Sequence, residues 1–65
     1  MKLERLCIYP KDIMIITGKS ERYSRKLLQE IKKQLGKKPN QFVTIKEFSE
    51  FSGLDEMEIN KIIQR

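Results

Sequence analysis

Each half of the chain opens with a short β-prone run and continues with apolar residues at helical spacing. Residues 6–9 (Leu-Cys-Ile-Tyr) predict a short extended segment. Pro10 can serve as the first residue of a helix, and Asp12 in its opening turn suits the helix dipole. The pattern predicts a helix over about residues 10–16, ended at Thr17-Gly18 because glycine tolerates a left-handed turn.

A longer helix should follow, because Ser20 is a good N-cap and Gly36 is a good stop. Apolar residues recur at every fourth position between these two signals, which predicts a single inward face. That face comprises Tyr23, Leu27, Ile31 and Leu35.

The second half of the chain repeats this order. Residues 41–44 again predict an extended segment, and the Thr44-x-x-Glu47 spacing of a capping box predicts the start of a third helix. Gly53 should end it, and Asp55, with an acid three residues later, should cap a fourth helix. The inward residues expected on these two helices are Phe48, Phe51, Ile59, Ile62 and Ile63.

The two halves align at an offset of 35 residues, which indicates one structural unit used twice. The matched segments are Lys11-Asp12-Ile13 with Lys46-Glu47-Phe48, and Thr17-Gly18 with Ser52-Gly53. We expect a mainly α, compact bundle of about four helices forming a single domain over 1–65. Its first unit would span about 9–35 and its second unit about 44–64. Chance similarity of two helical hairpins stays open as the alternative.

The first unit carries the pattern Ile13-x-x-Ile16-Thr17-Gly18-x-Ser20, followed by an apolar pair at Leu27-Leu28. This pattern resembles the helix-turn-helix of small DNA-binding regulators, whose common form is Ile-Ala-x-Leu-Thr-Gly-Val-Ser before a recognition helix. The second unit is similar at 48–54 and 59–63, so the resemblance covers most of the chain. It implies a small transcription regulator or an excisionase-like protein of a mobile element.

The chain departs from the motif at two positions. Lys19 stands where a hydrophobic residue is usual, and Ser24 stands where a hydrophobic residue or alanine is usual. If the register holds, the second helix should pack through Tyr23 and the Leu27-Leu28 pair instead. The positions that face the bases would then rotate by one residue.

Charge is distributed unevenly along the chain, whose net charge is +5. Residues 1–40 hold 11 cations and 4 anions, whereas residues 41–65 hold 3 cations and 5 anions. The basic half is the candidate surface for a polyanion, although this asymmetry alone does not separate nucleic acid from an acidic protein or a membrane surface.

Within the resemblance, the outward side of the second helix carries base-reading and phosphate-binding chemistry. Arg22 and Arg25 are suited to fork onto guanine, and Gln29 onto adenine. Lys19 or Ser20 would bind a phosphate beside the helix N-terminus. The further cations expected at this DNA interface, mainly for salt-sensitive phosphate contacts, are Lys26, Lys32, Lys33, Lys37 and Lys38.

The second unit should not enter DNA in the same way. Asp55, Glu56 and Glu58 would face the phosphates with the wrong sign. Its plainer role is to complete the core, and a sharper alternative is that its acidic face receives a basic partner such as a second copy. The expected core joins Phe42, Ile45, Phe48, Phe51, Leu54, Ile59 and Ile62 to Ile13, Ile16, Tyr23, Leu27 and Ile31.

Several classes of function are disfavoured by composition. The chain has no histidine, and its one cysteine, Cys7, lies in an apolar run, which excludes a His/Cys metal site and an internal disulfide. No pair of nucleophile and base can be proposed, so we expect neither an enzyme nor a cofactor. The longest apolar run, 13–16, is too short to span a membrane, and residues 1–5 are not followed by a signal-peptide core, so we expect a cytoplasmic protein without a membrane partner.

Two hypotheses remain for the function. The first is sequence-specific binding of double-stranded DNA, with a second copy or a neighbouring protein needed for useful affinity. The second is a protein-interaction or dimerisation module without direct DNA readout. An RNA-binding version has few aromatic residues available for stacking on bases.

Overall fold

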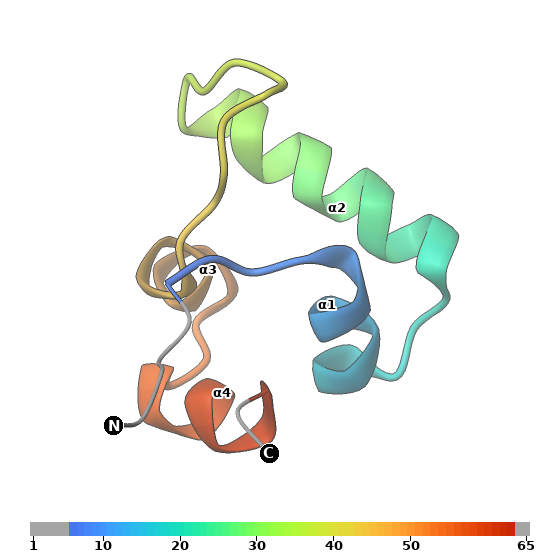
Figure 1. The fold of residues 1–65 in the computed structure, drawn as a ribbon, viewed down its shortest axis with the longest axis vertical. Coiled ribbons are helices and arrows are strands. Elements are labelled where there is room, and N and C mark those ends of the chain that lie inside the picture. The colour runs from blue at the N-terminus through green and yellow to red at the C-terminus, as the bar shows by residue number, and fades with distance from the viewer. Residues whose placement is uncertain (1–5, 64–65) are drawn as a thin grey trace.

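A computed structural model describes residues 6–63 and contains four α-helices in this range. They are α1 (Pro10–Thr17), α2 (Glu21–Gln34), α3 (Ile45–Ser52) and α4 (Glu56–Ile63). Figure 1 shows α1 between α2 and α4, and α1 packs against both of them while α3 packs against α4. The prediction of a small all-α bundle of four helices is confirmed.

Capping interactions explain where three of the helices begin. The hydroxyl of Ser20 accepts a hydrogen bond from the Tyr23 N–H (3.1 Å) and starts α2. The Thr44 hydroxyl accepts from the Glu47 N–H (3.0 Å), and the Glu47 carboxylate accepts in return from the Thr44 N–H (2.9 Å). At α1, the Asp12 carboxylate accepts from the backbone N–H of Tyr9 (2.8 Å). The two caps expected at Ser20 and Thr44 are therefore confirmed.

Two glycines close the short helices in the same way. Gly18 ends α1 with φ of 74°, and Gly53 ends α3 with φ of 78°. The Gly18 N–H donates to the carbonyl of Met14 (2.8 Å), and the Gly53 N–H donates to the carbonyl of Ser49 (2.9 Å). Because a left-handed backbone is strained for residues with a Cβ, these two positions favour glycine.

The two extended segments meet in an isolated antiparallel bridge between Cys7 and Thr44. The Ile8 N–H donates to the Val43 carbonyl (2.9 Å), and the Ile45 N–H donates to the Leu6 carbonyl (2.8 Å). At the 35-residue offset, Ile8 corresponds to Val43 itself, and both side chains are buried. The two hydrogen bonds flank the Cys7–Thr44 bridge and join the two extended segments.

The core collects buried apolar side chains from the bridge and from all four helices. They are Ile8, Ile13, Ile31, Val43, Ile45, Phe48, Ile59 and Ile63, with Ile16, Leu27, Leu28 and Ile62 packed against them. Several residues expected inside the core are exposed instead, and these corrections comprise Tyr23, Leu35, Phe42, Phe51 and Leu54.

The inward face of α2 differs from the expected one for a geometric reason. An α-helix has 3.6 residues per turn, so a four-residue step advances about 40° beyond a full turn. Over the three steps from Tyr23 to Leu35 this drift accumulates, and both end residues rotate out, with exposed fractions of 45% and 44%. The residues that α2 does turn inward are Ser24, Leu27, Leu28 and Ile31.

Ser24 occupies the buried position that the motif usually gives to alanine or a hydrophobic residue. It is fully buried, and its hydroxyl donates to the Ser20 carbonyl (2.9 Å), so its polar atom is satisfied within α2. The expectation that Tyr23 replaces Ser24 in the packing is wrong. The outward positions of α2 are therefore not rotated, and Arg22 and Arg25 are both exposed.

Candidate functional site

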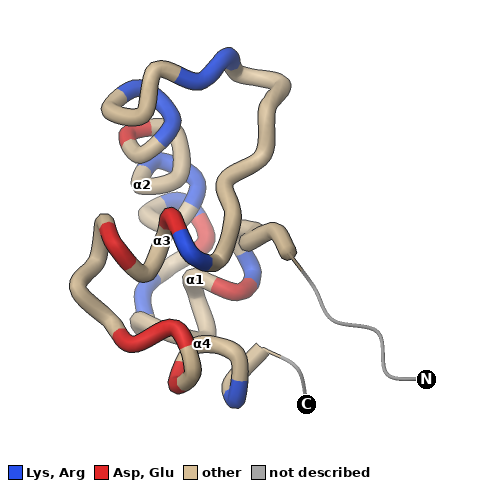
Figure 2. Tube along the Cα trace, turned by 90° about the vertical axis from the view of Figure 1, so that its left-hand side faces the viewer, with Lys and Arg blue, Asp and Glu red and all other residues tan. Residues whose placement is uncertain are grey.

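The exposed side of α2, with the cap that precedes it, is the candidate site. Figure 2 shows Lys and Arg gathered along α2, whereas Asp and Glu lie at the start of α4. We use the term basic face for the exposed residues Ser20, Arg22, Arg25, Lys26, Gln29 and Lys33. Four of them, Arg22, Lys26, Gln29 and Lys33, lie opposite the buried stripe of α2. Arg25 lies on the flank toward α1, and Ser20 precedes the helix as its N-cap.

One residue of the basic face has an acidic partner on the same helix. The Arg25 guanidinium lies 2.7 Å from the Glu21 carboxylate, one helical turn earlier. Both side chains stay accessible, with exposed fractions of 67% for Arg25 and 51% for Glu21. This contact follows from the i,i+4 spacing, although the sequence did not single out Glu21 as a site residue.

Lys19 lies at the turn into α2. Its ammonium nitrogen is 5.7 Å from the centre of the Tyr23 ring, within the range of a cation–π contact. Both residues are exposed, so the lysine that replaces the usual hydrophobic residue rests on the tyrosine instead of entering the core. Its ammonium group thus lies beside the N-terminus of α2.

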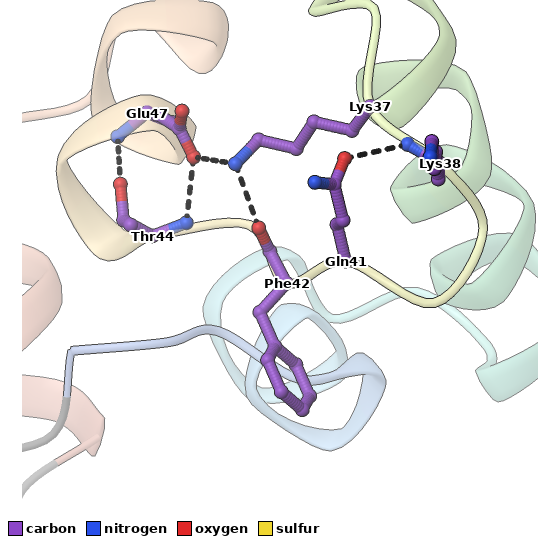
Figure 3. A network of polar contacts seen from close by, with 6 residues as sticks. All are labelled: Lys37, Lys38, Gln41, Phe42, Thr44 and Glu47. Atoms are coloured by element: carbon purple, nitrogen blue, oxygen red, sulfur yellow. Dashed lines mark hydrogen bonds and ion pairs between the residues drawn. The ribbon is translucent and has the colours of Figure 1, made fainter.

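Two of the expected phosphate-binding lysines make contacts inside the molecule. The Lys32 ammonium donates to the Pro39 carbonyl (2.8 Å). The Lys37 ammonium donates to the Phe42 carbonyl (2.8 Å) and lies 3.0 Å from the Glu47 carboxylate, as Figure 3 shows. These two cations fasten the connector after α2 to neighbouring backbone and to α3, which leaves them less available to an external partner than Lys33.

Lys38 completes the connector. Its backbone N–H donates to the side-chain carbonyl of Gln41 (2.7 Å), which closes a tight turn. Its side chain is exposed, so the ammonium group points to solvent near the C-terminal end of α2.

The contacts of Glu47 set its protonation behaviour. The hydrogen bond from the Thr44 backbone N–H, followed by the hydrogen bond from Lys37, lowers the pKa of Glu47 below its ordinary value of 4.5. Glu47 is therefore charged at neutral pH, and the capping box of α3 holds the connector through this charge. The sequence predicted the capping box but carried no signal for the lysine that joins it.

A surface hollow of about 530 Å³ lies between α1 and the start of α2. Its walls include Tyr9, Lys11 and Ile15 from α1 and its cap, together with Glu21 and Arg25 from α2. The Glu21–Arg25 pair thus lies on the flank of α2 that faces α1. Lys11 adds a cation beside the basic face that sequence reasoning did not select.

The second unit presents different chemistry at equivalent positions. Met57, which corresponds to Arg22, is 69% exposed, and Asp55 replaces Ser20. Glu56 and Glu58 are exposed beside Met57, and Glu58 lies 3.9 Å from Lys61. The surface at the start of α4 is therefore acidic with an apolar centre.

The chain matches no protein-family model, no curated protein and no solved structure. Among residues 6–63, no helix combines the length and the apolar character needed to cross a membrane. The observation on residues 1–5 and the last residue of the expected second unit, Gln64, lie outside the described part of the chain. The helix-turn-helix resemblance therefore stays a prediction.

Proposed function

We propose that the protein binds double-stranded DNA in a sequence-specific manner through the basic face of α2, as a small regulator or excisionase-like protein. The observation that carries the proposal is the exposure of this face on a helix that α1 braces across the Gly18 turn. A duplex major groove is wide enough to accept one α-helix. The N-terminal half of α2 would enter the groove, as recognition helices do.

Each part of the basic face has a partner chemistry on DNA. Arg22 and Arg25 fork onto guanine, and Gln29 pairs with adenine. Phosphates on one side meet Lys19 and the Ser20 hydroxyl near the helix N-terminus. The remaining lysines give sequence-independent affinity that falls as salt rises, with Lys33 and Lys38 better placed for this role than Lys32 and Lys37.

Affinity should be limited for a single copy. One module of this size buries a small interface, and single DNA-binding modules cover less area than dimers. A second copy or a neighbouring DNA-bound protein would therefore be needed for tight binding to a regulatory site.

Titration with duplex DNA at several salt concentrations tests the proposal. The Arg22→Ala/Arg25→Ala variant should bind at least about 10-fold more weakly, because each guanine contact contributes about 1–3 kcal/mol. The matched control is Lys46→Ala/Lys61→Ala, which removes the same charge from exposed positions outside the basic face. Absence of binding at low salt, or an equal loss in both double variants, would refute the proposal.

A second candidate function is self-association through the acidic surface at the start of α4. The supporting observation is that exposed Met57 and Leu54 lie among carboxylates, while the basic face of another copy offers opposite charge and aliphatic lysine stems. Sedimentation equilibrium should then show a salt-sensitive dimer that Glu56→Lys weakens and that duplex DNA displaces. A monomer at every concentration would reject this candidate and leave DNA binding standing.

A further inference from the structure

The Glu21–Arg25 pair is an unusual feature for a surface that faces polyanionic DNA. A carboxylate on such a surface is repelled by phosphates, so it opposes non-specific binding. Its contribution to stability as an exposed i,i+4 pair is small. In this contact the Arg25 guanidinium is directed toward the Glu21 carboxylate, with 2.7 Å between the two groups.

Hydrogen-bonding capacity remains on both members of the pair. A guanidinium has five N–H donors and a carboxylate about four acceptor sites, so a single contact leaves most of them available. Both side chains are more than half exposed. The pair therefore presents donors beside acceptors, one helical turn apart on the same face.

From this geometry we infer that the Glu21–Arg25 pair recognises a G·C base pair, with Arg25 on guanine and Glu21 on the cytosine amino group. The inference rests on the proposed function and names the base pair that this part of α2 selects. In the major groove, guanine offers the acceptors O6 and N7, and cytosine offers its N4 amino donor. The Arg25 donors thus match the guanine acceptors, and the Glu21 acceptors match the cytosine amino group, on the major-groove side of one base pair.

The other three base pairs fit less well. The reversed C·G pair places the cytosine amino group against Arg25 and the guanine O6 against Glu21, so like groups meet twice. An A·T pair offers Arg25 the acceptor N7 but places the adenine amino group beside it, and thymine O4 meets Glu21 as a second acceptor. A T·A pair matches the carboxylate through adenine N6 but offers Arg25 one acceptor where guanine offers two.

Selection of bound duplexes from a random pool, with wild type and three variants, tests the inference. Wild type should enrich G·C at one position. Glu21→Gln should lower that preference about 10-fold, while raising affinity for random duplex because a repelled charge is gone. Arg25→Lys should lower it as well, because a lysine keeps the charge but cannot fork onto guanine.

The matched control is Glu30→Gln, which removes the same charge from the same helix. Nine residues separate Glu30 from Glu21, so the two side chains lie on opposite sides of α2, about 180° apart. Both are exposed, and the control should leave the base preference unchanged. Comparison of Glu21→Gln with Glu30→Gln thereby separates a loss of charge from a loss of readout.

The outcomes distinguish this inference from the proposed function. If wild type binds DNA and Glu21→Gln keeps the full G·C preference, the inference is wrong and the proposed function stands. The same holds if Glu30→Gln lowers the preference as much as Glu21→Gln does. If wild type binds no duplex in the pool at low salt, the proposed function fails and the inference fails with it.

Discussion

The two units of the molecule share a backbone plan and differ on their surfaces. Each has an acid that accepts the N–H of the cap residue, a buried large apolar residue directly after it, and a left-handed glycine. Their second helices diverge, since α2 has a basic exposed side whereas α4 has an acidic start. A few internal positions therefore build the unit, while its exposed positions are free to carry different chemistry.

Equivalent core positions give the strongest test of the shared plan. Phe48→Ala should cost about 3–5 kcal/mol of unfolding free energy and Ile13→Ala about 2–5 kcal/mol, because each leaves a cavity in a small core. Both residues are fully buried. Urea denaturation followed by circular dichroism measures the loss, with Ile13→Val as the mild control. A loss under about 1 kcal/mol at either alanine variant would break the comparison.

Substitutions of Gly18 and Gly53 should also have matching effects on stability, smaller than those of the core substitutions. Gly18→Ala and Gly53→Ala should each cost about 1–2 kcal/mol, the penalty for a left-handed residue with a Cβ. Apart from the two chain neighbours, no described atom lies within 4 Å of the Cβ that either substitution adds, so the cost comes from the left-handed backbone and not from a clash. Thermal unfolding of both variants provides the measurement. If one substitution is neutral while the other is costly, the two turns are not equivalent.

The Lys37–Glu47 contact distinguishes the second unit by its pH dependence. Because the folded pKa of Glu47 is lowered, its contribution to stability is present above the ordinary value of 4.5 and is lost as pH falls through the folded value. Glu47→Gln should cost about 0.5 kcal/mol at pH 7, since glutamine can keep the cap but not the ion pair.

Unfolding free energies measured from pH 7 down to pH 3 test this effect. The part of the pH dependence that Glu47 supplies should disappear in Glu47→Gln and shrink in Lys37→Met. An unchanged profile in both variants would show that this contact does not couple protonation to stability.

Substitutions at exposed positions should change the free energy of unfolding least. Arg22 and Met57 occupy equivalent exposed places, so Arg22→Met and Met57→Arg should each change stability by no more than about 0.5 kcal/mol. Only Arg22→Met should weaken duplex binding. A large change in unfolding free energy for Met57→Arg would show that Met57 contributes to the packing of the second unit.

Local signals in the sequence were sufficient for helix boundaries. Ser20, Thr44, Gly18 and Gly53 act through hydrogen bonds and torsions within a few residues, so their effect is visible without the rest of the molecule. The outward direction of Arg22 and Arg25 was also predicted. Whether these residues contact DNA stays a prediction.

Local sequence signals could not show which way each side chain faces or which distant residues contact each other. Tyr23 and Leu35 fit an apolar period of four, yet the true helical period turns both to the surface. Phe42 and Leu54 are large apolar residues of the kind expected in a core, yet both are exposed. The Lys37–Glu47 contact joins residues ten positions apart, and nothing in either residue type announces its partner.

For this protein, sequence alone determined the four helices, the caps at Ser20 and Thr44 and the charge of each half, because these depend on neighbouring residues. Tertiary structure decided which apolar residues fill the core and which lysines are already engaged. It also brought the two extended segments together at the Cys7–Thr44 bridge. The physical reason is that burial and pairing depend on distances across the fold, and those distances exist only after the two units have packed together.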